Sequence, residues 1–150
     1  MQHSILVTQI LLASLQGFAL AGEALGQDTA APAEPPLLAV ELNLVEQHEK
    51  TCRLTFVAQN TLGGDLLALV FETVLFDRAG QVIDLTLFDF QDLPDGSPRV
   101  RQFDLADVSC ASIGRVLFND VHACTSESLT PEVCATGLRW SSRTGVEVLG

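Results

Sequence analysis

Apolar and polar residues alternate with a period of two along most of the chain after residue 36. The alternation is clear at 40–44, where valine and leucine alternate with polar residues, and again at 52–59. A period of two places successive side chains on opposite faces of a β-strand, whereas an amphipathic helix needs a period of about 3.6 residues. Because no long helical period occurs in the sequence, the pattern predicts a fold built from strands.

The clearest predicted unit is a β-hairpin over 66–90. An apolar run at 66–76 is followed by Asp77-Arg78-Ala79-Gly80 and then by an alternating segment at 81–90. Aspartate at the first turn position can bond its own backbone, and glycine at the fourth position accepts the exit dihedral angles. The run at 66–76 is apolar on both faces, which is typical of a central strand covered on both sides or of a strand that bends at its middle.

Turn signals separate the other alternating segments, and one helical turn is expected at 107–112. The expected strands are 40–44, 52–58, 66–76, 81–90, 99–105, 114–122 and 136–142. Neighbouring strands joined by short turns pair antiparallel. The sequence therefore predicts an all-β fold, an antiparallel immunoglobulin-like β-sandwich of about seven strands over 37–143, with a loosely held tail at 144–150. Trp140 lies in the last expected strand, so the core tryptophan of true immunoglobulin domains has no counterpart.

The N-terminal 26 residues are predicted to be an export signal. Residues 5–15 are mostly apolar and are followed by Ala19-Leu20-Ala21, a small-x-small cleavage pattern. A membrane-attached helix is the alternative, but polar residues interrupt the apolar run, which is shorter than a spanning helix requires. Residues 27–36 are rich in alanine and proline and form the expected spacer. We expect a periplasmic or secreted protein with no stable membrane span after cleavage.

The chain has four cysteines, Cys52, Cys110, Cys124 and Cys134. Export favours disulfides over free thiols, and we favour the pairs Cys52–Cys110 and Cys124–Cys134 among the possible pairings. The second pair brackets a polar loop that has little core of its own. A metal site made of Cys124, Cys134 and His122 is the alternative, but these residues lack the close C-x-x-C pairs of structural zinc sites.

Charge and motifs exclude several classes of function. The formal net charge is −11, and such a surface repels the phosphate backbone of nucleic acids. No G-x-S-x-G motif and no glycine-rich phosphate loop are present. Asp120 and His122 could share one strand face, and an acidic loop at 84–95 could supply oxygen ligands, but its spacing differs from that of calcium loops. We therefore expect no enzymatic activity and no cofactor.

The segment 113–121, with the sequence IGRVLFNDV, is the most distinctive part of the chain. Alternation there places Val116 and Phe118 inward in a core strand. The outward residues Arg115, Asn119 and Asp120 form a candidate interaction surface. The simpler interpretation, which the pattern favours, is that they are the solvated face and turn of that core strand.

The run from Cys110 to Cys124 resembles a family of small, uncharacterised secreted proteins of alphaproteobacteria. The LFDxxG hairpin at 75–80 and the SSR sequence at 141–143 resemble this family too, so the likeness covers about residues 40–143. Some members are labelled twin-arginine-pathway signal proteins, although this chain has no arginine pair near its start. The resemblance implies export and a shared fold, and it implies no known activity.

Together these observations predict an exported, non-enzymatic β-sandwich module that binds a protein or an envelope component. The alternative is a small periplasmic metal- or ligand-dependent protein that uses the acidic 84–95 loop or the pair Asp120 and His122.

Overall fold

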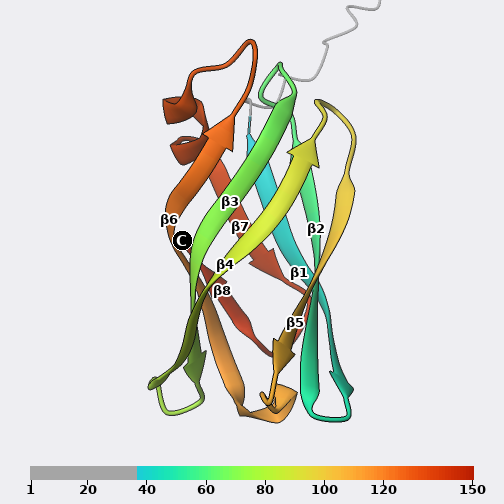
Figure 1. Ribbon diagram of the computed structural model, residues 1–150, viewed down its shortest axis with the longest axis vertical. Helices are drawn as coiled ribbons and strands as arrows, with labels where there is room; N and C mark the ends of the chain where they lie inside the picture. Colours follow the sequence, from blue (N-terminus) through green and yellow to red (C-terminus); the bar gives the residue numbers. More distant parts are fainter. Residues whose placement is uncertain (1–36) are drawn as a thin grey trace, which may run out of the picture. The chain divides into compact units, whose positions relative to one another are not determined.

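The computed structural model describes residues 37–150, so the predicted signal and spacer, 1–26 and 27–36, lie outside the described residues. The described part forms eight strands in two sheets of four (Figure 1). The strands are β1 (Leu38–His48), β2 (Thr51–Asn60), β3 (Leu66–Asp77), β4 (Val82–Leu93), β5 (Arg99–Ala106), β6 (Ile113–Thr125), β7 (Leu138–Ser142) and β8 (Glu147–Leu149). Two 3-10 turns, η1 (Cys110–Ser112) and η2 (Pro131–Ala135), complete it. In this part of the chain no helix is long and apolar enough to cross a membrane.

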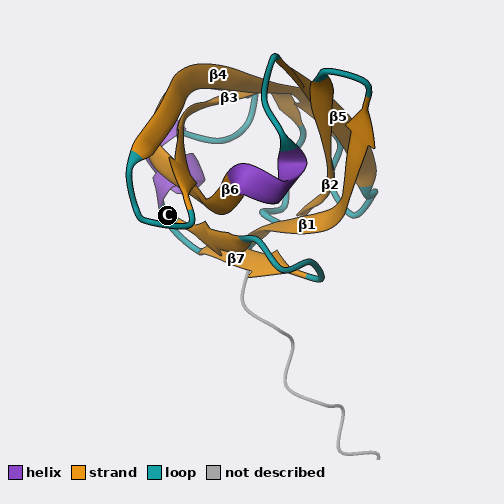
Figure 2. Ribbon diagram, turned by 90° about the horizontal axis from the view of Figure 1, so that it is seen from below, coloured by secondary structure: helices purple, strands orange, loops and turns teal. Residues whose placement is uncertain are grey.

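The two sheets pack face to face as a β-sandwich, which confirms the predicted fold class. Their strand orders are β5-β2-β1-β7 and β4-β3-β6-β8. Most pairs are antiparallel, but β7 pairs parallel with β1, and β8 pairs parallel with β6. After β6 the chain passes to the opposite sheet as β7 and returns as β8, and Figure 2 shows β7 beside β1 in the ring of strands. The immunoglobulin-like strand order stays a prediction.

The predicted hairpin over 66–90 is present as β3 and β4. At its turn the Asp77 Oδ1 atom accepts hydrogen bonds from the backbone amides of Ala79 and Gln81, both at 2.8 Å. Gly80 has a φ angle of +83°, a conformation that glycine adopts without steric cost. Local turn chemistry therefore fixes where the hairpin reverses, whereas the register of β3 against β4 shifts at irregularities farther along the pair.

The core lies between the sheets and is centred on a cluster of phenylalanines. Phe56 of β2 is fully buried, and its ring lies 5.8–5.9 Å from four other phenylalanine rings. Those rings belong to Phe88, Phe90, Phe103 and Phe118. Three of them come from the opposite sheet, so Phe56 is the main aromatic contact between the two layers.

The described domain contains two disulfides, Cys52–Cys110 and Cys124–Cys134. This is the pairing that the sequence favoured. The first ties buried Cys52 of β2 to η1. The second ties the end of β6 to η2 and so pins the polar segment between β6 and β7.

The C-terminal segment, expected to be a loose tail, is part of the second sheet. Val146 and Val148 are buried, and β8 pairs with residues 115–117 of β6. The segment before β8 is also held, because the Arg143 side chain forms an ion pair with Glu41 at 2.7 Å. Burial of the two valines explains why this short segment is ordered, and it brings the number of strands to eight.

Candidate interaction face

The side chains of β6 alternate between the core and the solvent, as the sequence predicted. Val116 and Phe118 face the core and are 0% and 4% exposed. Arg115 and Asn119 are exposed on the opposite side, with half-buried Leu117 between them. The outer surface of the β4-β3-β6-β8 sheet therefore carries two of the three predicted interaction residues, and exposed Asp120 follows directly.

An apolar row crosses this surface from one sheet edge to the other. Backbone pairing places Leu85 of β4 opposite Val74 of β3, Val74 opposite Leu117 of β6, and Leu117 opposite Leu149 of β8. Leu85 is 62% exposed and Leu149 is 38% exposed, whereas Val74 in the middle is 9% exposed. We name these four residues the outer row.

Polar side chains border the outer row on both sides. Arg115 donates a hydrogen bond from its Nε atom to Glu147 at 2.6 Å, and its guanidinium lies 5.9 Å from the centre of the Phe76 ring. On the other side the Asn119 amide donates to the Glu72 carboxylate at 3.3 Å. The outer row therefore reaches solvent at its two ends, where apolar side chains bordered by polar groups resemble the composition of a protein-binding surface.

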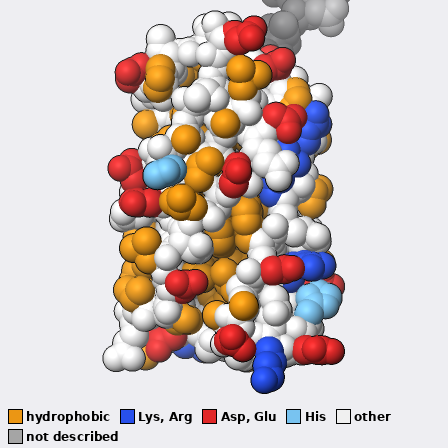
Figure 3. Space-filling view, in the orientation of Figure 1, with side chains coloured by type: hydrophobic (Ala, Val, Ile, Leu, Met, Phe, Trp, Pro, Cys, Tyr) orange, Lys and Arg blue, Asp and Glu red, His pale blue; other side chains and the backbone are white. Residues whose placement is uncertain are grey.

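Charge is unevenly distributed over the molecule. In the view of Figure 3, apolar side chains are scattered over the strands β3, β4 and β6 with acidic side chains among them, and most of the lysine and arginine side chains visible there lie on the side of β5. Two of the three carboxyl groups with lowered pKa values belong to ion pairs of the β5-β2-β1-β7 sheet, and the third, Glu132 of η2, has its pKa lowered by hydrogen bonds from its own backbone and from Thr130. A hydrogen bond from Arg53 lowers the pKa of Asp104, and one from Arg143 lowers the pKa of Glu41.

The expected acidic loop at 84–95 is mostly strand. Asp84, Asp89 and Asp92 lie along β4, and only the end of the segment forms the turn toward β5. Extended backbone spreads these carboxylates along the strand instead of gathering them around one point. Asp120 and His122 are both exposed on β6, and no group of three potential metal ligands occurs within residues 37–150.

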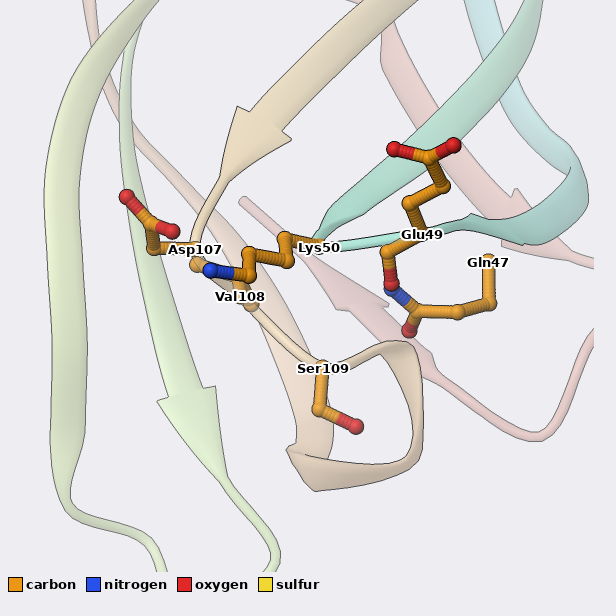
Figure 4. A pocket seen from close by; sticks show the side chains of 6 residues that line it. All are labelled: Gln47, Glu49, Lys50, Asp107, Val108 and Ser109. Atoms are coloured by element: carbon orange, nitrogen blue, oxygen red, sulfur yellow. The ribbon is translucent and has the colours of Figure 1, made fainter.

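A polar hollow lies between the β1–β2 turn and the segment that precedes η1 (Figure 4). Glu49 and Asp107 border it with φ angles of +50° and +57°. Figure 4 shows the Lys50 side chain extending toward Asp107, while the Glu49 carboxylate points away. The Gln47 amide joins the two segments, since it donates to the Glu49 carbonyl at 2.9 Å and accepts from the Cys110 amide at 2.8 Å. These bonds hold together the two segments that form the hollow, so its shape has a structural cause. The residues that line it do not include a nucleophile next to a general base.

A smaller cavity of about 170 Å³ lies between β6 and β7. Its apolar wall includes Trp140, which stacks on Phe118 at 4.3 Å, and Phe71. Asn119 and Asp120 form its polar border, so it adjoins the Asn119 end of the candidate interaction face. The cavity is large enough for one side chain and too small for most cofactors.

Comparisons with known proteins do not show a family for this chain. No protein-family model matches the chain, and no curated protein matches it. A solved structure of IrmA from Escherichia coli is similar with a TM-score of 0.49 at 14% identity, over 73% of this chain and 92% of IrmA.

Sequence reasoning placed Arg115, Asn119 and Asp120 but missed the outer row. The sequence feature that could have indicated the outer row is the run at 66–76, which is apolar on both faces. A strand of this kind is normally covered on both sides. In residues 37–150 the structure places no second layer over that face of β3. The uncovered apolar side chains are those of the outer row and its neighbours.

Proposed function

We propose that this chain is an exported, non-enzymatic β-sandwich module that binds another protein through the outer row and its polar border. The observation that carries the proposal is the in-register apolar strip Leu85–Val74–Leu117–Leu149, which reaches solvent at both ends. Single exposed apolar residues are common on proteins, but a contiguous strip bordered by polar groups marks a contact surface.

The chemistry of the border favours a protein partner with basic residues around an apolar centre. Carboxylates on the same sheet include Glu72, Asp89 and Asp120, and the whole chain has a net charge of −11. Anionic lipid headgroups and nucleic acids would be repelled by this charge. In the described residues no observation favours the metal- or ligand-dependent alternative.

Export is supported by the two disulfides, since such bonds form and persist in oxidising compartments. Intact mass of the protein from an envelope fraction, before and after reduction, tests this part. Chains that begin at Gly22 or Gln27 and gain four hydrogens on reduction would support it. An uncleaved chain with free thiols would overturn it.

Binding is tested by comparing three immobilised proteins, wild type, Leu117→Lys and Val100→Lys, in envelope extracts. Val100 is the matched control because it is 58% exposed on β5, in the other sheet. A partner should be retained by wild type and by Val100→Lys, and lost by Leu117→Lys. Loss of a central contact costs about 2 kcal/mol or more, so titration of the identified partner should show roughly 30-fold weaker binding. Equal retention by all three proteins would refute the proposed surface.

A further inference from the structure

The cavity between β6 and β7 lies where the edge of β6 is left uncovered. Among the described strands, β8 pairs with β6 only at residues 115–117 of β6. Beyond that point β6 continues to Thr125, and the cavity of about 170 Å³ lies between this part of β6 and β7 of the other sheet. A cavity of about 150 Å³ is enough to hold a molecule as large as benzene. The space therefore fits one side chain.

Three aromatic rings that contact one another form part of the cavity wall. Trp140 stacks on Phe118 at 4.3 Å, and the ring of Phe71 lies edge-on to Trp140 at 5.2 Å and to Phe118 at 5.1 Å. The backbone at Gly150 lies against the nitrogen edge of the indole, where an added Cβ atom would collide with Trp140. Phe71 and Phe118 are buried and Trp140 is half-buried, so this aromatic wall is fixed by the folded domain.

The polar side of the cavity is formed by β6, at a point where the strand is irregular. The pairing with β3 skips Asn119 and His122, so each is an extra residue of β6. Bulges of this kind bend a strand and re-aim the neighbouring side chains. Asn119 and Asp120 line the cavity at the first of them. The amide of Asn119 donates to the Glu72 carboxylate, which leaves the Asn119 side-chain carbonyl as an acceptor.

Two carboxylates face each other at this point without a cation between them. Backbone pairing places Glu72 of β3 directly opposite Asp120 of β6. Neither carboxylate takes part in the ion pairs of residues 37–150. The Oδ1 atom of Asp120 accepts a hydrogen bond from the Val121 amide at 2.8 Å, so its Oδ2 atom is left as an acceptor. Like charges directly opposite each other destabilise a pair of strands, and a bound cation would remove this cost.

We propose that the cavity binds an arginine side chain of the protein partner, with its methylene groups against the aromatic wall and its guanidinium at Asp120. The inference rests on the proposed function, because the arginine belongs to that partner. Arginine has the chemistry of both sides of the cavity, since its planar guanidinium packs on aromatic rings and donates to carboxylate and carbonyl oxygens. Leu117 of the outer row is followed two residues later by Asn119, so one partner can contact the row and the cavity together.

The test is titration of the purified, disulfide-intact protein with N-acetyl-arginine methylamide, followed at Trp140. This is the only tryptophan of the sequence, so its fluorescence and its indole N–H signal in NMR report on the cavity directly. We expect a saturable change with a Kd on the order of 1 mM, as for a single small ligand of this size. The corresponding citrulline derivative has nearly the same shape but no charge, and it should not bind in this range.

Two pairs of matched variants locate the binding. Asp120→Asn should weaken binding of the arginine probe roughly 3- to 10-fold. Asp84→Asn is its control, because Asp84 belongs to the same sheet and also accepts a hydrogen bond from the next amide at 2.8 Å. Ala135→Leu fills the cavity from η2 and should abolish binding, whereas Ala111→Leu in η1 should leave it unchanged. Both alanines are exposed and follow a disulfide-bonded cysteine in a 3-10 turn.

Three results of the titration would overturn the inference. The first is a change at Trp140 that rises linearly without saturation, as collision at the surface produces. The second is equal binding of the citrulline derivative, which would assign the cavity to a neutral side chain. The third is an affinity that Asp120→Asn and Asp84→Asn change alike.

Failure of the proposed function is distinguishable from failure of this inference. Leu117→Lys should abolish retention of the partner and leave the affinity for the arginine probe unchanged. Asp120→Asn should weaken the partner and the probe by a similar factor. A partner that Leu117→Lys releases, but that binds Asp120→Asn as tightly as wild type, would contradict the arginine anchor alone. Equal retention of a partner by Leu117→Lys would refute the outer row, and the titration with the probe still decides the cavity.

Discussion

Replacing Phe56 by alanine should be among the most destabilising single changes in the described domain. Phe56 is fully buried, and its ring contacts phenylalanines from both sheets. Removing a buried phenylalanine side chain costs about 3–5 kcal/mol, because transfer energy is lost and a cavity remains. Four rings surround this position, so collapse around the cavity would have to move several strands at once. We therefore expect the upper part of that range.

Two further variants show whether the cost comes from packing. Phe56→Leu keeps most of the volume but loses the edge-on ring contacts, so it should cost about 1–2 kcal/mol. Phe76→Ala removes a half-buried ring on the outer surface, where the Arg115 guanidinium lies over it, and should cost about 1 kcal/mol.

Urea unfolding followed by fluorescence and circular dichroism measures all three variants. A domain of this size has an m-value of about 1–1.5 kcal/mol/M, so the midpoint for Phe56→Ala should fall by roughly 3–5 M. That loss is a large share of the about 5–15 kcal/mol that stabilises a typical domain. The reasoning fails if Phe56→Ala loses less than about 1 kcal/mol. It also fails if Phe76→Ala costs as much as Phe56→Ala.

Three other outcomes are expected. Replacing Cys124 and Cys134 together by alanine should lower the free energy of unfolding by about 3 kcal/mol in the chain-entropy model. Amide hydrogen exchange should increase first in η2, which this disulfide ties to β6. A uniform increase across the domain would show that the disulfide does not hold η2 locally. The pKa of Glu41 is lowered by a hydrogen bond from an arginine, so its stabilising contribution is present above the unfolded pKa and is lost as pH falls through the folded pKa. The difference in Tm between wild type and Glu41→Gln should therefore shrink on acidification, and a constant difference would refute the linkage. Val148→Asp should detach β8, which increases amide exchange at the paired residues of β6, whereas unchanged exchange there would show that β8 does not protect them.

The parts of the fold that follow from local chemistry could be predicted from the sequence. The turn at Asp77 contains its own hydrogen bonds, so the β3–β4 hairpin was evident. Alternation alone was enough to place Val116 and Phe118 inward on β6. Both features depend on residues that are close together in the chain.

The parts that depend on distant pairing could not be predicted. Strand β8 has three residues, too few for a recognisable alternation, and it is ordered because Val148 is buried and the backbone pairs with β6. The outer row needs the register of four strands at once, and no segment of sequence encodes that register by itself. For the same reason Arg115 and Asn119 were identified as exposed residues, while the apolar strip between them was not.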